Sequence, residues 1–376
     1  MSTVNTRLSL GLHLVVFRIL RMRLLLAVVV ALALFRVISA EQALIAALVV
    51  VVVLVSARRV ALKAITPRVK AVCQIRVGER HLLASAGRRP VITVNDPDTG
   101  NVVATLIGHR WGVNALCEVE VDGRPLLASG GDDRTVRLWE PGSGRQVSVL
   151  KATMAALRGV CQVRVGDRVL LAAGGDDQAI RLWDPASGEL VRVLSPRAGG
   201  VMAVSTVHSE GGELLATAHL DRTLRLWDPA TGEQLRVLTG HHDGWPTALC
   251  QIRAADEILL ASADTHQKVR LWNPATGEQL RSMEDDFGSL HALCQVEVGE
   301  RHLLASAGDG PGVKLWDPAT GEHVGTVGGV EGFTGSFGCG WVQALCQIDV
   351  GGELRLATGG YDKTVNTWRL TDLSVS

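Results

Sequence analysis

The sequence predicts an all-β fold, a β-propeller of seven four-stranded units, preceded by a short hydrophobic α-helical segment that enters a membrane as a hairpin. Three observations lead to this prediction. A tryptophan recurs at spacings of 44 to 52 residues, a turn with proline and glycine follows most of these tryptophans, and two apolar runs lie before residue 58. Repeats of about 40–45 residues with strand signals are typical of propeller blades rather than of helical solenoids.

The repeat has seven units. Successive tryptophans are spaced 44, 44, 45, 44 and 52 residues apart, at Trp139, Trp183, Trp227, Trp272, Trp316 and Trp368. Asn95 lies 44 residues before Trp139, within "VITVNDPDTG", which has the same outline without the tryptophan. The 41 glycines agree with a fold that has many turns and few long helices.

Residues 113–152 show how one unit is expected to fold. The segments "NALCEVEV", "LLAS", "TVRLW" and "QVSVL" have the apolar or alternating pattern of strands. The segment "EPGSG" places proline early and glycine late, as a tight turn requires. No segment after residue 65 has convincing helical periodicity. We therefore expect four strands and no helix in each unit.

These units resemble the WD-repeat family. The residues that carry the resemblance are "GH" at 108–109 and 240–241, "LLASGGDDRTVRLW" at 126–139 and "TLRLWD" at 223–228. The resemblance covers about residues 60–376. It implies a seven-bladed propeller around a central channel, in which each sequence repeat lends its last strand across to the neighbouring blade.

The resemblance also implies a structural tetrad of hydrogen-bonded side chains. Unit two has all four members, His109, Ser129, Asp133 and Trp139. The aspartate recurs in three further units, but the same position holds Arg89 in unit one, His266 in unit five and Gly310 in unit six. We expect the network to be partial, and therefore weaker, outside unit two.

Composition and motifs argue against several classes of function. Basic and acidic residues both number 38, so the chain as a whole has no charge that would attract nucleic acid. It has no phosphate-binding glycine loop, no Gly-x-Ser-x-Gly elbow and no pair of CxxC motifs. We expect no catalytic residue, cofactor or metal. His241 stands beside His242 and Asp243, but it completes a "GH" and is expected to have a structural capping role.

Six of the seven cysteines share one register in the repeat, at Cys73, Cys117, Cys161, Cys250, Cys294 and Cys346. A thiol that occurs once per unit packs within its own unit, so we expect small buried residues rather than disulfides or metal ligands. Reduced thiols suit a cytoplasmic location. Cys339 is off this register and is expected to be the most exposed thiol.

Three tryptophans outside the strand register are candidate partner-binding residues. Trp111, Trp245 and Trp341 lie five or six residues before a register cysteine, in the loop that leads into a blade. In WD-repeat proteins this loop opens on the face where partners dock, and tryptophan is the residue most enriched at interface hot spots. The alternative is that each tryptophan covers the top of its own blade.

Charged and aromatic residues near these tryptophans extend the candidate site. The arginines expected on the same face include Arg110, Arg134 and Arg222. An excess of eight residues before unit seven gives a glycine-rich segment, 327–341, that holds Phe333 and Phe337. We expect this segment to be either a binding loop or an insertion tolerated at the surface.

The amino-terminal 57 residues predict a membrane segment. Two apolar helices are expected at about 24–40 and 43–57, since one helix from 24 to 57 would exceed the thickness of a bilayer. Basic residues flank the pair on both outer sides, so the positive-inside rule places both ends, and the propeller, in the cytoplasm. A cleaved signal peptide ending near residue 40 would leave one span. A single-span arrangement with the propeller outside is the other alternative.

The tail of the apolar segment is expected to close the propeller. "SARRVALKA" at 56–64 resembles "SGRQVSVLKA" at 143–152, which is the turn and outer strand of unit two. Unit seven ends only eight residues after Trp368. We therefore expect residues 60–64 to supply its outer strand and remove an exposed edge, unless the carboxy-terminal "LSVS" does so. The propeller would then span residues 58–376.

Two functions from different classes fit the sequence. The first is a membrane-tethered scaffold that binds a protein or peptide partner on the top face of the propeller. The alternative is a propeller enzyme or ligand sensor that uses the central channel, because fold alone does not fix function. The predicted channel-facing strands, such as "VKAVCQIRV", contain no cluster of acid–base or metal-binding groups, which favours the scaffold.

Overall fold

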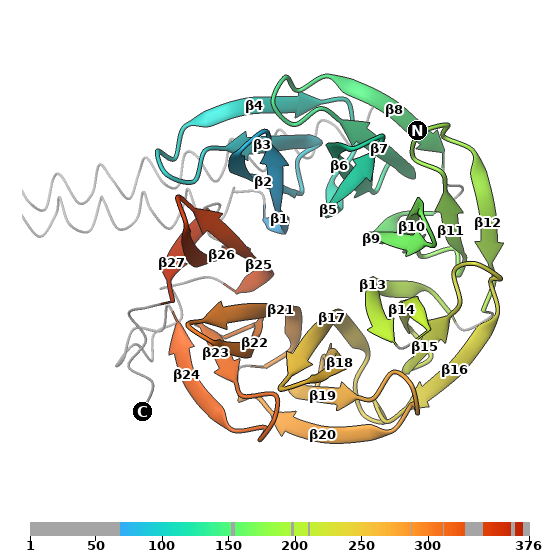
Figure 1. Cartoon of the computed structure of the whole chain (residues 1–376), viewed down its shortest axis with the longest axis vertical. Coiled ribbons are helices and arrows are strands. Elements are labelled where there is room, and N and C mark those ends of the chain that lie inside the picture. The colour runs from blue at the N-terminus through green and yellow to red at the C-terminus, as the bar shows by residue number, and fades with distance from the viewer. Residues whose placement is uncertain are drawn as a thin grey trace, which may run out of the picture. The chain divides into compact units, whose positions relative to one another are not determined.

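Seven antiparallel sheets form a ring in which the first strand of each sheet lies nearest the central axis (Figure 1). This computed structural model describes residues 68–151, 155–196, 199–209, 211–286, 288–310, 312–327, 341–361 and 365–370. All of its regular elements are strands. The prediction of an all-β, seven-bladed propeller is confirmed.

Each sheet is one blade, and its strands follow the chain from the axis outwards. The first strands are β1 (Val69–Val77), β5 (Val113–Val121), β9 (Leu157–Val165), β13 (Val201–Ser209), β17 (Pro246–Ala254), β21 (Leu290–Val298) and β25 (Val342–Val350). The second strands are β2 (Arg80–Gly87), β6 (Arg124–Gly131), β10 (Arg168–Gly175), β14 (Gly212–His219), β18 (Glu257–Asp264), β22 (Arg301–Gly308) and β26 (Glu353–Gly360).

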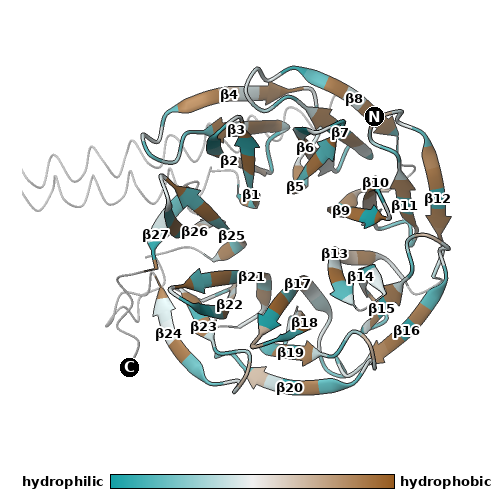
Figure 2. Ribbon diagram, viewed as in Figure 1, coloured by the Kyte–Doolittle hydropathy of each residue, from teal (hydrophilic) through white to brown (hydrophobic). Residues whose placement is uncertain are grey.

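The outer half of each blade carries the repeating tryptophan and the turn. The third strands are β3 (Val91–Asn95), β7 (Thr135–Trp139), β11 (Ile180–Trp183), β15 (Thr223–Trp227), β19 (Lys268–Trp272), β23 (Val313–Trp316) and β27 (Val365–Arg369). The outer strands are β4 (Val102–Ile107), β8 (Gln146–Lys151), β12 (Leu190–Leu194), β16 (Gln234–Thr239), β20 (Gln279–Glu284) and β24 (His323–Val327). Aliphatic side chains also face outward from these strands, as on β4 and β12, which are brown in Figure 2.

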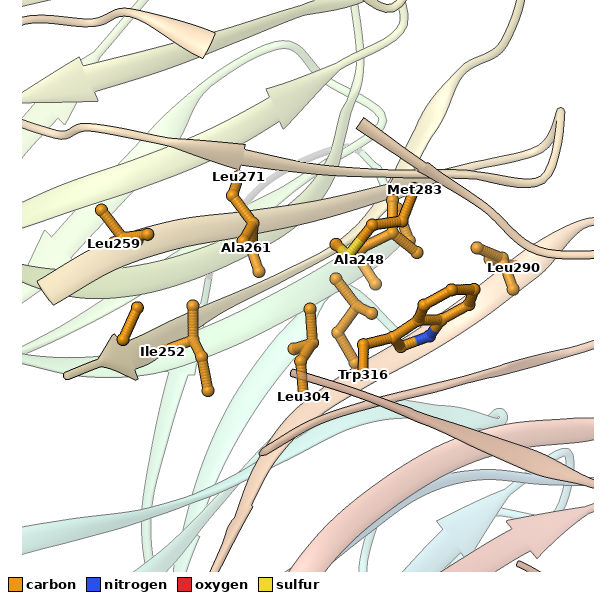
Figure 3. Close-up of a cluster of buried hydrophobic side chains, with 13 residues drawn as sticks. Ala248, Ile252, Leu259, Ala261, Leu271, Met283, Leu290, Leu304 and Trp316 are labelled. Carbon is orange, nitrogen blue, oxygen red and sulfur yellow. The ribbon is translucent and has the colours of Figure 1, made fainter. Parts of the chain in front are cut away.

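The hydrophobic core lies between neighbouring blades. Figure 3 shows one cluster, in which Ile252, Leu271 and Met283 of blade five meet Leu304 and Trp316 of blade six. The same arrangement recurs around the ring, with the third-strand tryptophan packed against the preceding blade at six interfaces. The recurring tryptophans are therefore core residues, as the spacing predicts, and each supplies a large apolar surface to one interface.

The interface that closes the ring, between blades seven and one, differs from the other six. The equivalent position in blade one is Asn95, so this cluster contains Leu83 and Val72 of blade one but no tryptophan. Ile348 and Ala344 of blade seven complete it. The closing interface consequently buries less aromatic surface than its neighbours.

A belt of hydrogen bonds runs around the first strands and includes the closing interface. In each blade a backbone N–H donates to a side-chain oxygen of the next blade, at 2.5–2.8 Å. The seven pairs are Arg76 to Glu118, Glu120 to Gln162, Arg164 to Glu213, His208 to Gln251, Arg253 to Gln295, Glu297 to Gln347 and Asp349 to Gln74. Five of the acceptors are the residue that follows a register cysteine in the sequence and carries an amide.

Blade seven is described as a three-stranded sheet, β25–β26–β27. Residues 60–64 and the carboxy-terminal "LSVS", the two predicted sources of its outer strand, lie outside the described residues. The predicted membrane helices at 24–40 and 43–57 lie outside them as well. Among the residues that the structure describes, no helix is long and apolar enough to cross a bilayer.

Candidate interaction face

Two sets of loops form one face of the propeller, which we call the top face. The leading loops connect an outer strand to the first strand of the next blade, and the middle loops connect the second and third strands of one blade. In all seven blades the first residue of the middle loop donates a backbone hydrogen bond to the leading loop, at 2.8–3.2 Å. The acceptors are Arg68, Gly112, Ala156, Gly200, Trp245, Ser289 and Trp341. This bond holds the two loops together beside each first strand.

Blade two contains the hydrogen-bonded tetrad that its sequence suggests. His109, in the leading loop, lies 2.9 Å from Asp133 Oδ1 through Nδ1 and 2.7 Å from Ser129 Oγ through Nε2. Trp139 Nε1 donates to the same Ser129 Oγ at 2.8 Å. Burial alone would raise the pKa of Asp133, but the bonds from His109, the Arg110 backbone and Thr135 outweigh it and hold the pKa well below its usual range. The network fastens the leading loop to the blade.

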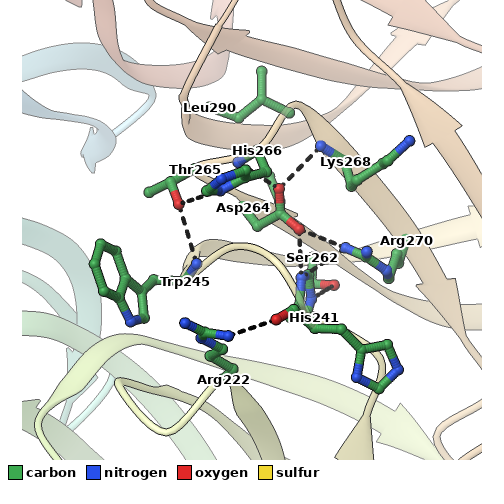
Figure 4. A network of polar contacts seen from close by, with 12 residues as sticks. Arg222, His241, Trp245, Ser262, Asp264, Thr265, His266, Lys268, Arg270 and Leu290 are labelled. Atoms are coloured by element: carbon green, nitrogen blue, oxygen red, sulfur yellow. Dashed lines mark hydrogen bonds and ion pairs between the residues drawn. The ribbon is translucent and has the colours of Figure 1, made fainter.

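Blade five has an equally complete network, which corrects the expectation of a partial one there (Figure 4). His241 contacts Ser262 Oγ at 2.8 Å and Asp264 Oδ2 at 2.9 Å, and Trp272 Nε1 donates to Ser262. The carboxylate comes from Asp264 at the end of β18, two positions before His266. Arg270 Nη1 also donates to Asp264, at 2.6 Å. His241 is buried, and its predicted structural role agrees with these contacts.

The other blades retain only parts of the network. In blade six the buried Asp285 accepts a hydrogen bond from Ser306, which in turn accepts one from Trp316 Nε1, both at 2.8 Å. In blade four His219 comes from β14 itself and contacts Thr217 at 2.8 Å. Burial and the neighbouring Arg225 lower the pKa of His219 to about 4. The tetrad position therefore has different hydrogen-bond partners in different blades, and each blade still forms.

The three candidate tryptophans all lie on the top face and are accessible. Trp111 is 66% exposed, and Trp245 and Trp341 are each 47% exposed. They belong to the leading loops of blades two, five and seven, so they are distributed around the ring rather than gathered in one cluster. Gly112 fixes the path of the first loop, because a Cβ there would lie 3.1 Å from both Gly87 O and Asp132 Oδ2. That close approach leaves little room for a side chain at position 112.

Trp341 belongs to an aromatic–cation stack that sequence reasoning missed. Its ring meets the Tyr361 ring edge-to-face, with 4.9 Å between centroids and 74° between planes. The guanidinium of Arg68 lies over the Tyr361 ring, 3.6 Å from its centroid, in a cation–π contact. Tyr361 is the only tyrosine in the sequence and takes the position that Asp132 has in blade two. The tyrosine at this position, where blade two has an aspartate, is the sequence feature that could have indicated the stack.

The predicted arginines differ in how they are held. Arg222 Nη1 donates to the His242 carbonyl at 2.6 Å, which ties it to the loop that carries Trp245 (Figure 4). Arg110 and Arg134 are exposed, and neither side chain has a bond to a described residue. Phe333 and Phe337 lie outside the described residues, so their role stays a prediction.

A polar chain links the first strands of blades one to three beneath the arginines. Lys70 Nζ donates to Asn114 Oδ1 at 2.6 Å. The amide of Asn114 in turn donates to Asp132 Oδ1 and to the Leu157 carbonyl. Burial lowers the pKa of Lys70, Asp132 raises it, and the neighbouring arginines lower it again.

The register cysteines occupy equivalent places on six first strands and are free thiols. Each packs against a core cluster between blades, as Cys73 does with Ile75 and Leu116. Burial raises the pKa of Cys73, Cys161 and Cys250 to about 12. Cys339 lies outside the described residues. Within the described ranges, no group of three or more His, Cys, Asp or Glu side chains is placed to hold a metal ion.

Comparison with known families agrees with this architecture. The family profile described as "WD domain, G-beta repeat" matches residues 100–140 and 188–228. Each match runs from the outer part of one blade through the tryptophan of the next, so the sequence repeat and the blade are offset as expected. The chain therefore contains WD40 repeats within a seven-bladed propeller. A search of curated proteins found no match. WD40 propellers are typically protein-interaction scaffolds and are generally not enzymes.

Proposed function

We propose that this WD40 propeller is a scaffold that binds a protein or peptide partner on its top face. The observation that carries the proposal is the exposure of Trp111, Trp245 and Trp341, each of them on a leading loop fastened to its blade by a backbone hydrogen bond or a tetrad. Exposed aromatic side chains on rigid loops lose little entropy when a partner covers them.

The positions of the three tryptophans favour an extended partner. They lie in blades two, five and seven, so one partner that touches all three must cross the mouth of the channel. Covering each of them removes apolar surface from water, and a typical stable interface needs such anchors near its centre.

The test is affinity capture with the intact chain and with a Trp111→Ala, Trp245→Ala, Trp341→Ala variant. We expect the triple variant to lose partners that the wild-type chain retains. A matched control replaces three exposed aliphatic residues on the outer strands, Val102→Ala, Ile107→Ala and Leu190→Ala, and should retain them. Capture of every partner at wild-type strength by the tryptophan variant would reject the site.

We further propose that residues 1–57 tether the scaffold to a membrane, with the propeller, residues 58–376, on the cytoplasmic side. The two apolar runs and the basic residues on both outer sides support this. The full chain should remain in the membrane fraction after alkaline extraction. A protease added to intact cells should leave the propeller uncut, and cleavage there would favour the single-span alternative.

A further inference from the structure

We infer that the partner segment is an acidic linear peptide, which binds across a cationic sector of the top face. This sector consists of Arg68, Lys70, Arg88, Arg110 and Arg134, from blades one and two, together with the rings of Trp111, Trp341 and Tyr361. The inference rests on the proposed function, because it names the chemistry of the partner that the top face would bind.

The positive charges of this sector outnumber the unpaired carboxylates beside them. Arg88, Arg110 and Arg134 are exposed, and no ion pair joins them to a described residue. Two nearby carboxylates are already paired. Asp133 is buried within the blade-two tetrad and pairs with Arg137, and Asp176 pairs with Arg158 at 2.9 Å. Asp132 accepts the Asn114 amide and keeps its negative charge, which offsets one of the five positive charges of the sector. The free cations are therefore available to carboxylates of a partner.

Lys70 shows that the positive charges act on one another. It lies at the start of β1. Burial lowers its pKa most and Asp132 raises it, while Arg158, Arg68 and Arg88 each lower it. Groups with this mutual repulsion are stabilised when an anion approaches, because the anion offsets several like charges at once. The sector is therefore electrostatically complementary to a chain of several carboxylates rather than to one.

The stack beside these cations supplies orientation and an apolar contact. The Arg68 guanidinium carbon lies 3.6 Å from the Tyr361 ring centroid. A guanidinium positioned against an aromatic ring can still donate paired N–H bonds to a carboxylate. The ring of Trp341, which is 47% exposed, meets the same tyrosine ring edge-to-face. A peptide with acidic residues and an apolar side chain would match both features.

Acidic side chains elsewhere on the propeller make other surfaces less favourable for binding an acidic peptide. On the far side of the top face, Asp243 is exposed, and Asp286 is exposed but pairs with Lys314. At the opposite end of blades seven and one, a groove of about 290 Å³ is lined by Glu79, Asp96 and Asp98 among others. The acidic segment of the partner is therefore directed to the cationic sector, and a part of the partner without acidic residues would contact Trp245.

The test measures binding of a fluorescein-labelled octapeptide of glutamate and leucine to the detergent-solubilised full chain. An Arg88→Gln, Arg110→Gln, Arg134→Gln variant should bind about tenfold more weakly, since several exposed ion pairs are removed together. Glutamine suits the left-handed backbone at Arg134, because Gln178 and Gln267 adopt it at the equivalent positions. A matched control, Arg124→Gln, Arg253→Gln, Arg281→Gln, removes the same charge elsewhere and should bind as the wild type does.

Three results would overturn the inference. One is equal binding of the peptide by the sector variant and the wild-type chain. Another is binding of an octapeptide of lysine and leucine as tight as that of the acidic one. The third is displacement of the peptide by glycerophosphoserine or inorganic phosphate as readily as by unlabelled peptide, which would assign the sector to small anions or lipid headgroups. If captured partners still depend on the three tryptophans in any of these cases, the scaffold proposal stands and only the acidic chemistry fails.

Discussion

The backbone N–H of Asp349 donates a hydrogen bond to Gln74 Oε1 at 2.6 Å and so joins strands 275 positions apart in the chain. Six equivalent bonds link the other blades, but only this one lies at an interface whose hydrophobic cluster contains no tryptophan. Arg68 adds a second cross-blade contact there through the Tyr361 ring. Closure of the ring therefore depends on polar contacts to a greater extent than the other six interfaces do.

Gln74→Ala should lower the free energy of unfolding by about 1–3 kcal/mol, because it leaves the half-buried Asp349 N–H without its acceptor. The matched variant is Gln162→Ala, which removes the same bond at an interface that Trp183 also supports. Denaturant unfolding monitored by tryptophan fluorescence measures both. We expect the larger loss for Gln74→Ala. Equal losses of unfolding free energy in the two variants would show that this hydrogen bond stabilises the closing interface no more than it stabilises the others.

The sequence could predict the blades because their determinants are local. Each third-strand tryptophan packs on one neighbour, and each turn has its own proline and glycine, so a spacing of about 44 residues translates directly into blades. The side chains that complete the networks could not be placed in this way. Asp264 takes the role of Asp133 from a position two residues earlier, because a carboxylate needs only to reach the histidine in space.

The contact between Arg68 and Tyr361 on the top face could not be predicted from the sequence for the same reason. The leading loops and their three tryptophans follow from register alone. Arg68 and Tyr361 lie 293 positions apart, and only closure of the ring brings the guanidinium over the phenol. No pattern within one repeat contains a contact between the first and last blades.

Asp264→Asn should destabilise the protein by about 3 kcal/mol, because the buried Arg270 loses its ion pair. His266→Asn is the matched change at the position that aligns with Asp133, and it should stay within about 0.5 kcal/mol of wild type since His266 is exposed. Burial tends to raise the pKa of Asp264, but bonds from His241 and Arg270 hold it well below normal. Its stabilisation is therefore present above about pH 4 and is lost as the pH falls further. A large loss in His266→Asn instead would reverse the assignment.

Stability should also decline between about pH 6.5 and pH 4 through His219. Burial, with Arg225 nearby, lowers the pKa of this histidine to about 4, while Asp221 acts in the opposite sense. The unfolded chain therefore binds the proton first as the pH falls, at about pH 6.5, which favours unfolding by up to about 3 kcal/mol at the lower end of the range.

Guanidinium unfolding of the wild type and of His219→Gln at pH 7.5, 5.5 and 4.5 would measure this effect. The variant should lose part of the pH dependence and retain the part that comes from His241, whose pKa burial also lowers. An unchanged slope in the variant would show that His219 does not carry the effect.

The six register thiols should react slowly with a thiol reagent in the native state. Burial raises the pKa of each of them, to about 12 for Cys73, so the reactive thiolate is scarce at pH 8. Cys339, which is predicted to be exposed, should account for the fast reaction in the folded chain. Counting reacted groups with and without guanidinium tests this, and Cys339→Ser should remove the fast phase. Persistence of that phase would place the accessible thiol among the register cysteines.

Two variants of the full chain would show which segment supplies the outer strand of blade seven. Among the described residues β27 is the outermost strand of its blade, and an exposed strand edge invites aggregation. If residues 60–64 supply an outer strand beyond β27, replacing them by glycine and serine at constant length should lower the melting temperature and cause aggregation of the solubilised protein. Deleting residues 373–376 should then have little effect. The reverse result would assign the strand to "LSVS", and the membrane segment would then join the propeller through a true linker rather than through its last blade.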